Sequence, residues 1–247
     1  MRHYEILANK CIPYFPNIEL APEKTMALLP KKLIIKGNRL FERLQHKKNI
    51  SELTTEEMAE CESLSTELLN YTKEHLTTYK MAQYVLNKSN SNDVQSILYL
   101  SGDTNPDYMR CLTLHGFKKI LGKNCHDYPI IPHIYKQTNV DYSNFHGKGM
   151  TYSGLLDLDL HDAESDKNVE QDILNKKYDL IIYGSLHRGM PFYDLVCDTY
   201  ESDKIILLCG EDIRVYGPGA PPYGKNIHKC EHTKLAMKGH YVFVREL

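Results

Sequence analysis

Tryptophan, an excess of either charge and long apolar runs are all missing from the sequence. Its 30 basic and 32 acidic residues give a net charge of -2. The basic residues do not gather into a stripe, so nucleic acid is not expected as a partner. The longest apolar runs are too short to cross a bilayer, and Arg2, His3 and Glu5 stand where a secretion signal would need an apolar core. We therefore expect no membrane span and a cytoplasmic protein.

Paired cysteines and the common cofactor-binding motifs are also missing. The 7 cysteines are an odd number without a CxxC pair, which argues against a disulfide framework and favours a reducing compartment. The sequence has no P-loop, no dinucleotide-binding GxGxxG, no GxSxG elbow and no HExxH. These absences argue against a nicotinamide or methyl-donor site, and no cofactor or metal ion is predicted.

The composition that remains is that of a soluble globular protein, with 42% hydrophobic and 25% charged residues. A chain of 247 residues can form one large domain or two smaller ones. The stretch 87–93 is polar and turn-rich, and it offers no core residue. We therefore predict a domain boundary there, with a mainly helical part over 1–92 and a second domain over 93–247.

Three apolar runs in the second part end in glycine, with polar or charged residues just beyond. These runs are 97–103, 179–185 and 205–212. Each is short and bounded by turn residues, which predicts buried strands, and helical stretches separate them. The predicted fold is therefore α/β: a parallel Rossmann-like sheet with flanking helices, joined to a smaller, mainly helical N-terminal part. Ligands bind outside the carboxyl ends of such strands.

Other segments give weaker indications of local structure. Thr54 and Glu57 have the spacing of a capping box at the start of a helix. Residues 32–37 are predicted to be a strand or extended piece stopped by glycine, and 240–245 another strand. The stretch from about 121 to 149 is expected to be an irregular loop after a helix near 108–121.

The residues from Tyr4 to Phe15 read Tyr-Glu-Ile-Leu-Ala-Asn-Lys-Cys-Ile-Pro-Tyr-Phe. This segment resembles the donor-binding segment of two-domain glycosyltransferases of the GT-B fold, most closely the exostosin-like ones. The resemblance implies that Glu5 binds hydroxyls of the donor nucleotide and that Pro13 fixes the following turn. Lys10 departs from the family, which usually has glycine there. The partner acidic residue would lie before Met1, so the chain is expected to begin inside the motif.

The stretch from Ile97 to Leu247, with its glycine-ended strands, resembles a Rossmann-like domain found beside glycosyltransferase segments in large-virus-type proteins. In GT-B enzymes the N-terminal Rossmann half binds the acceptor and commonly supplies a general base. The resemblance implies that His187 or Asp103 acts as this base, and that Arg188 balances phosphate charge. The binding residues predicted along this edge are Gly102, Gly184, Ser185, Arg188 and Glu211.

Each of these positions also has a purely structural interpretation. Asp103 can cap the helix that follows Pro106. His187 and Arg188 can hydrogen-bond neighbouring carboxylates such as Asp194, and Glu5 can be a solvated helix carboxylate. Three further segments give weaker signals: an Asp-x-Asp at 157–159 of the kind that holds a metal ion, possible soft metal ligands at 228–232 and a flap-like loop at 217–224.

The function expected from these patterns is that of a glycosyltransferase-type protein that handles a nucleotide-sugar donor and a glycan acceptor. In that mechanism His187 or Asp103 is the base, while Arg188 and Glu5 position the donor. Two alternatives stay open. The chain can be a non-catalytic remnant or nucleotide- or sugar-binding module of a larger glycosyltransferase, or an unrelated Rossmann-like hydrolase that uses His187.

Overall fold

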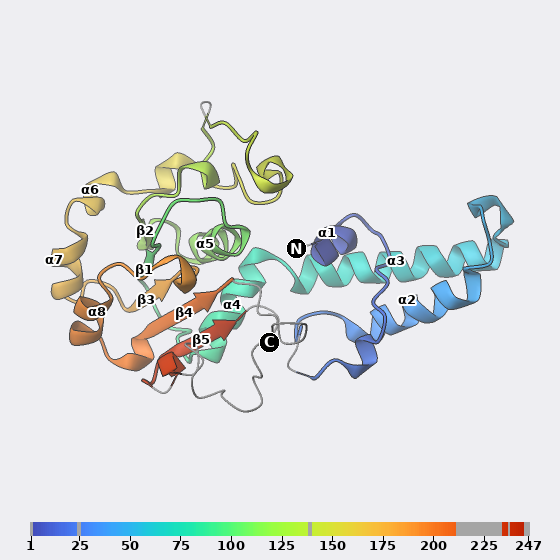
Figure 1. The fold of residues 1–247 in the computed structure, drawn as a ribbon, viewed down its shortest axis with the longest axis horizontal. Helices are drawn as coiled ribbons and strands as arrows, with labels where there is room; N and C mark the ends of the chain where they lie inside the picture. The colour runs from blue at the N-terminus through green and yellow to red at the C-terminus, as the bar shows by residue number, and fades with distance from the viewer. Residues whose placement is uncertain (1, 24–25, 138–139, 211–233, 237, 245–247) are drawn as a thin grey trace, which may run out of the picture. The chain divides into compact units, whose positions relative to one another are not determined.

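The computed structural model describes all residues except 1, 24–25, 138–139, 211–233, 237 and 245–247 (Figure 1). The chain divides into two compact units between Lys80 and Met81. The boundary predicted at residues 92 and 93 lies further along the chain, beyond the helix α4 (Thr78–Lys88). Within the described residues, no helix combines the length and the apolar character that a membrane span requires.

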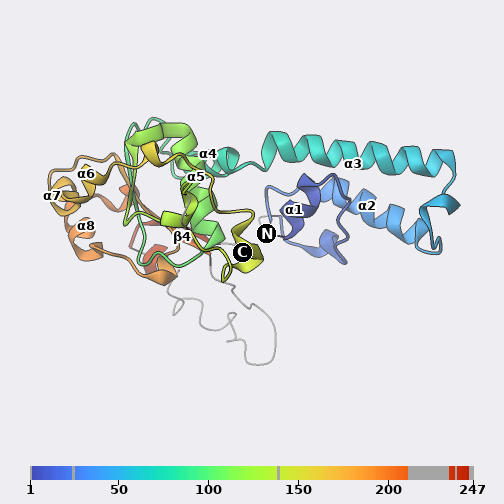
Figure 2. The same ribbon diagram turned by 90° about the horizontal axis from the view of Figure 1, so that it is seen from above.

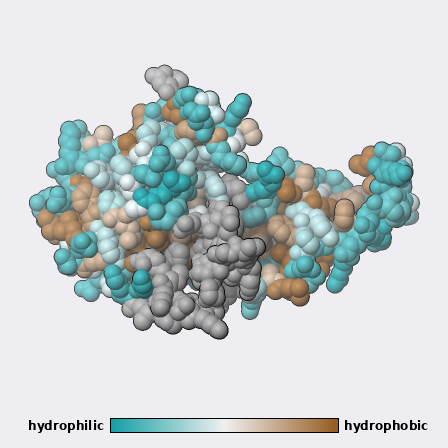
Figure 3. Space-filling view, viewed as in Figure 1, coloured by the Kyte–Doolittle hydropathy of each residue, from teal (hydrophilic) through white to brown (hydrophobic). Residues whose placement is uncertain are grey.

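The first unit is helical. It contains α1 (Arg2–Ala8), the short 3-10 turns η1 (Ile18–Leu20) and η2 (Ile50–Glu52), and the two long helices α2 (Lys31–Leu44) and α3 (Thr55–His75). α2 runs back along α3, and α1 packs beside them (Figures 1 and 2). The core of this unit includes buried aliphatic side chains from all three helices, and the end of the hairpin where α2 gives way to α3 is mainly hydrophilic (Figure 3).

The strand predicted over 32–37 is wrong, because these residues form the first half of α2. Gly37 does not stop the segment. A Cβ there would lie 2.6 Å from Cγ2 of Ile12, so the glycine lets another segment pack closely against the helix. The next residue, Asn38, donates its amide to the Phe15 carbonyl (2.6 Å) and accepts from the Phe15 backbone N–H (3.1 Å). The apolar residues therefore belong to the buried face of a helix. Over so few residues, the spacing of apolar side chains does not distinguish such a helix from a strand.

The capping box predicted at Thr54 is confirmed. Its hydroxyl accepts from the backbone N–H of Glu57 at 3.1 Å, and the Glu57 carboxylate accepts from the backbone N–H of Thr54 at 2.8 Å. These two bonds satisfy donors that would otherwise face the solvent at the start of a 21-residue helix.

The second unit confirms the predicted α/β fold. Five parallel strands stand in the order β2-β1-β3-β4-β5. Their bounds are β1 (Ile97–Leu100), β2 (Cys125–Tyr128), β3 (Leu180–Tyr183), β4 (Ile205–Cys209) and β5 (Tyr241–Val244). One buried cluster joins the sheet to α4 and α5 (Tyr108–Leu121), and a second joins it to α7 (Val169–Leu174) and α8 (Tyr193–Thr199), so helices cover both faces (Figures 1 and 2).

The irregular loop expected between 121 and 149 contains an unpredicted edge strand, β2. Its sequence, Cys-His-Asp-Tyr, lacks an apolar run, yet all of it except Tyr128 is buried. Polar side chains inside a strand become tolerable only when partners satisfy them. Those partners come from α5 and from residues 158–166, which include the short helix α6 (Ala163–Asp166). Tertiary contacts therefore determine β2, and no local pattern indicates it.

The strand order places a topological switch point between β1 and β3. From β1 the chain crosses to β2 on one side, and it then returns to β3 on the other side of β1. The two connections leave the carboxyl edge in opposite directions, so the loops after β1 and β3 frame the place where doubly wound sheets bind ligands.

Candidate functional site

The loops after β1 and β3 meet at Gly102. A Cβ at this position would lie 2.1 Å from the Arg188 carbonyl oxygen and 2.5 Å from Cα of Gly189. Gly184, which follows β3, donates its N–H to the Leu100 carbonyl, and a Cβ on it would lie 2.2 Å from the hydroxyl of Tyr99. Both predicted binding glycines therefore permit close packing, and the two loops form one continuous rim.

Arg188, in the loop after β3, contacts two carboxylates of the loop after β1. Its Nε donates to Oδ2 of Asp107 at 2.8 Å, and one terminal nitrogen lies 3.6 Å from Oδ2 of Asp103. The prediction that Asp103 and Arg188 converge at one edge of the sheet is confirmed. The carboxylates that Arg188 meets are Asp103 and Asp107, which both belong to the loop after β1.

Two residues of this arrangement were missed by sequence reasoning, Asp107 and Arg110. Asp107 is the N-cap of α5, where its carboxylate accepts from the backbone N–H of Arg110 at 3.1 Å. Asp103, which sequence reasoning considered for that cap, instead accepts from the N–H of Asn105 at 2.9 Å. The signal for Asp107 was available, since an aspartate directly before a helical stretch is a preferred N-cap.

The side chain of Arg110 binds backbone carbonyls of the loop between β1 and α5. Its side chain is fully buried, and one terminal nitrogen donates to the Asp103 carbonyl at 2.5 Å and lies 3.2 Å from the Asp103 carboxylate. The other donates to the carbonyl of Asn105. A buried guanidinium in contact with two carbonyls and a carboxylate holds the loop in one conformation, which fixes where Asp103 lies.

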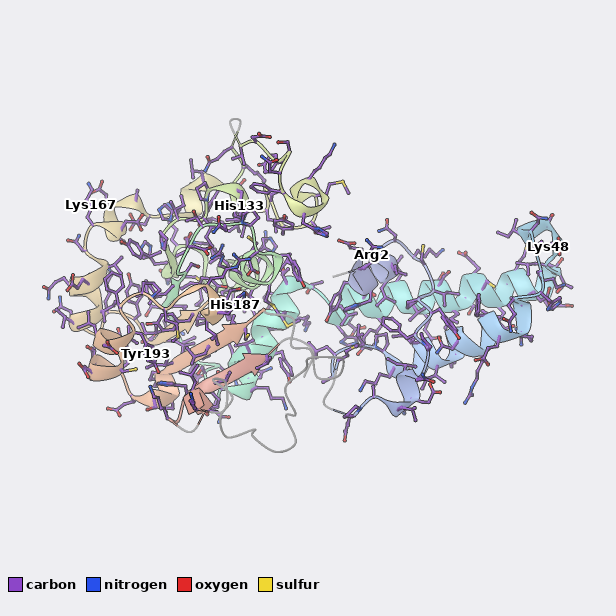
Figure 4. The ribbon with its side chains drawn as sticks, viewed as in Figure 1. Arg2, Lys48, His133, Lys167, His187 and Tyr193 are labelled. Atoms are coloured by element: carbon purple, nitrogen blue, oxygen red, sulfur yellow. The ribbon has the colours of Figure 1, made fainter. Side chains whose placement is uncertain are left out.

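His187 lies at the end of the sheet toward which the strands run (Figure 4). Its Nε2 is 3.8 Å from Oδ2 of Asp107, and its Nδ1 is 4.0 Å from Sγ of Cys209 at the end of β4. The imidazole therefore stands between the carboxylate that begins α5 and the thiol at the end of β4. With 21% of its side chain exposed, it can reach a ligand at the rim.

The electrostatics distinguish the two predicted bases. Burial alone would raise the pKa of Asp103, but hydrogen bonds from Asn105 and Arg110 outweigh it and lower that pKa. Burial opposes ionisation of Asp107 in the same way, and hydrogen bonds from Arg110 and Arg188 lower its pKa as well. Both carboxylates are therefore ionised near neutral pH and are weak proton acceptors. The lowered pKa therefore argues against Asp103 as the base.

Ser185 occupies an unusual backbone conformation within the rim. It follows Gly184 with φ 65° and ψ 64° and is fully buried. Its hydroxyl oxygen lies 3.5 Å from where a Cβ on Gly210 would stand, so the loop after β4 borders the same region. Left-handed backbone at a residue other than glycine carries strain and is common at functional sites.

The remaining predicted residues belong to other parts of the chain. Glu5 lies on α1 of the first unit. Glu211, Asp212 and the segments 217–224 and 228–232 lie outside the described residues. In the Asp-x-Asp at 157–159, Asp157 pairs with Lys136 at 2.7 Å. No group of three or more histidine, cysteine or acidic side chains in the described ranges has the geometry of a metal site.

Comparisons with protein-family models, curated proteins and solved structures found no match.

Proposed function

We propose that the second unit is a glycosyltransferase-type domain that binds a sugar at the rim between the loops after β1 and β3. One observation carries this proposal: Asp103 and Asp107 from one loop meet His187 and Arg188 from the other, at the switch point of a doubly wound sheet. Ligands of such sheets bind at this place.

The charge balance of the rim indicates the class of ligand. Asp103 and Asp107 contribute two negative charges, and Arg110 and Arg188 contribute two positive ones, which pair with them. A diphosphate would have to draw Arg188 away from its carboxylates. A neutral sugar would not, because its hydroxyls can donate to carboxylates and accept from a guanidinium without displacing a charge. Asp103 and Arg188, whose side chains are about one-third exposed, are the groups open to such contacts.

The same geometry suggests how a sugar hydroxyl would react. His187 would take the proton of the acceptor hydroxyl as that oxygen attacks the donor sugar. Asp107, ionised and 3.8 Å from Nε2, would stabilise the imidazolium that forms. Asp103 would bind hydroxyls and would not act as base. The new bond would join the acceptor oxygen to the anomeric carbon of the donor sugar, and the nucleoside diphosphate would leave from that carbon with the bonding electron pair.

The proposal is tested with the full chain by calorimetric titration with nucleoside diphosphate sugars and with free oligosaccharides, followed by a transfer assay. We expect sugar binding that weakens at least about tenfold in Asp103→Asn, since a charge-assisted hydrogen bond contributes about 1.5–3 kcal/mol. His187→Gln should keep binding and lose transfer. Absence of binding to every sugar and nucleotide sugar would refute the proposal.

A second candidate is a sugar-binding module without catalysis. The close packing of Gly102 against Arg188 and Gly189 favours it, because the rim is held rigid by its own ion pairs. Sugar binding that is equal in the wild type and in His187→Gln, with no transfer by either protein, would identify this module. Release of free sugar in the absence of an acceptor would instead indicate a hydrolase that uses His187.

A further inference from the structure

Residues 158–166, called the strap here, lie along the edge strand β2 through side-chain contacts. The strap contains the 3-10 turn η6 (Leu158–Leu160) and α6 (Ala163–Asp166). Lys118 of α5 donates to the carbonyl of Leu160 at 2.8 Å. β2 pairs only with β1 among the described strands, so the strap contacts the strand at the edge of the sheet.

His161 is the centre of the contacts that join the strap to β2. Its Nδ1 lies 3.2 Å from Oδ1 of Asp127, and its Nε2 lies 3.1 Å from Oδ2 of Asp166. The other oxygen of Asp166 lies 3.1 Å from Nε2 of His126. His126 and Asp127 are neighbours in β2, so their side chains point to opposite faces of the sheet. The strap therefore contacts side chains on both faces of this strand.

The chemistry of these contacts depends on a proton. A carboxylate can only accept hydrogen bonds, and both ring nitrogens of His161 face carboxylate oxygens. Only the imidazolium carries N–H groups on both nitrogens. A neutral ring would turn one lone pair toward a carboxylate, so one of the two contacts would become repulsive. The link between Asp127 and Asp166 is therefore complete only while His161 is protonated.

The two carboxylates beside His161 favour its protonated form. Burial would lower its pKa, but Asp127 and Asp166 outweigh burial and raise it. Burial lowers the pKa of His126, with help from the charges of His161 and Lys118. The other titratable groups that face the cluster are Lys118 and Tyr135, both hydrogen-bonded to or paired with Asp127, together with Asp162 and Tyr178.

The raised pKa of His161 determines how the stability of this contact changes with pH. A histidine whose pKa is raised in the folded state contributes stability that is fully present below its ordinary value of about 6.5. That contribution disappears as the pH rises through the raised folded pKa. Asp127 keeps Lys118 and Tyr135 as partners throughout, and Lys118 keeps its bond to Leu160, so the contacts that weaken are those that His161 makes with Asp127 and Asp166.

We infer that His161 is a pH-dependent clasp: protonated, it fastens the strap to β2 through Asp127 and Asp166, and deprotonated, it loosens the strap from this edge strand. The strand that the strap contacts also supports the loop of the candidate site. Ser101, just before Gly102, donates its backbone N–H to the carbonyl of Tyr128 at the end of β2 (2.9 Å).

The test is hydrogen–deuterium exchange of the full chain, read by mass spectrometry and corrected for the intrinsic pH dependence of exchange. Between about pH 6 and about pH 9, we expect protection of β2 and the strap to fall about tenfold, as loss of one charge-assisted hydrogen bond implies. Protection of β3 and β4 should stay constant. Equal protection of β2 at both pH values would overturn the inference.

Variants assign the effect to His161. In His161→Gln, the strap should exchange rapidly at both pH values, whereas His146→Gln, at an exposed histidine of the same unit, should behave as the wild type. A pH response retained in His161→Gln would place the titrating group elsewhere and overturn the inference. NMR titration of the wild-type histidines gives an independent readout that requires no variant: His161 must titrate above about 6.5, and a lower midpoint would refute the clasp.

Discussion

The Nε atom of Arg188 lies 2.8 Å from Oδ2 of Asp107, a residue 81 positions earlier in the sequence. Arg188 belongs to the turn after β3, and Asp107 begins α5 after β1. The pair therefore spans the switch point of the sheet. Asp107 simultaneously caps α5 and faces His187, so one carboxylate couples the start of a helix, the arginine and the imidazole.

This pair should contribute a measurable but modest coupling to stability. Arg188 keeps 29% of its side chain exposed, so solvent screens the attraction, and we expect a coupling of about 1 kcal/mol. The measurement is a double-mutant cycle of Arg188→Met and Asp107→Asn in urea unfolding at neutral pH. Asp107→Asn keeps a helix cap, because asparagine is also a preferred N-cap residue, so the cycle reports the pair itself. A coupling near zero would show that the contact has no energetic role.

Gly102→Ala should separate the two loops. The added Cβ would meet backbone atoms of Arg188 and Gly189, which cannot turn aside as a side chain can. We expect a loss of about 1–3 kcal/mol in unfolding free energy, as for other overpacked sites, together with weaker sugar binding. Gly210→Ala is the matched control in the same region. Its Cβ would meet Cβ of Met109 at 3.0 Å, a milder overlap than the 2.1 Å approach at Gly102. If both variants cost the same, the backbone contact at Gly102 is not what closes the rim.

Thr54→Ala should destabilise the first unit through its longest helix. The substitution removes the hydroxyl that accepts from the backbone N–H of Glu57. Loss of such a cap costs about 1 kcal/mol. Thr55→Ala, one residue later and equally exposed, removes a hydroxyl that does not cap the helix. Thermal unfolding followed by circular dichroism compares the two, and equal midpoints for both variants would contradict the assigned cap.

The strands could be predicted where burial alone determines them. β1, β3 and β4 are apolar runs buried along their whole length, and a short apolar run between turn residues is enough to indicate such a strand. β2 could not be predicted in this way. Its Asp127 belongs in the interior only because Lys118 and Tyr135, from other elements, reach it. The information that defines β2 is distributed along the chain.

The candidate site shows the same limit. The parallel sheet brings Asp103, His187 and Arg188 to one edge, as glycine-ended strands predicted. Asp107 and Arg110 lie beyond the strand, and their importance comes from the partners they meet in three dimensions. Sequence reasoning therefore located the rim, but it could not establish that Asp103 is engaged by Arg110 and is a weak base.

The buried pair of Lys118 and Asp127 gives the sharpest test of the second unit. Their charged atoms lie 2.8 Å apart with almost no exposed surface. Removing one partner takes the nearest opposite charge from a buried ion, so Lys118→Met and Asp127→Asn should each cost about 3 kcal/mol, the lower end for a broken buried pair, because His161 still faces Asp127 and two carbonyls still accept from Lys118. The double variant removes both charges of this pair and keeps an oxygen that accepts from Tyr135. It should cost less than the sum of the single variants, and strict additivity would mean that the charges do not interact.

The pair also predicts how acid acts on the protein. Burial would raise the pKa of Asp127, but His161, Lys118 and Tyr135 outweigh it and lower that pKa to about 2. An aspartate in an unfolded chain has a pKa of about 3.9. Because the folded value is the lower one, the stabilisation is present above about pH 4 and is lost as the pH falls toward about 2. Urea unfolding of the wild type at about pH 4 and about pH 2 should therefore show a steeper loss than in the double variant, where residue 127 no longer titrates. Parallel losses in the two proteins would assign acid sensitivity to other carboxylates.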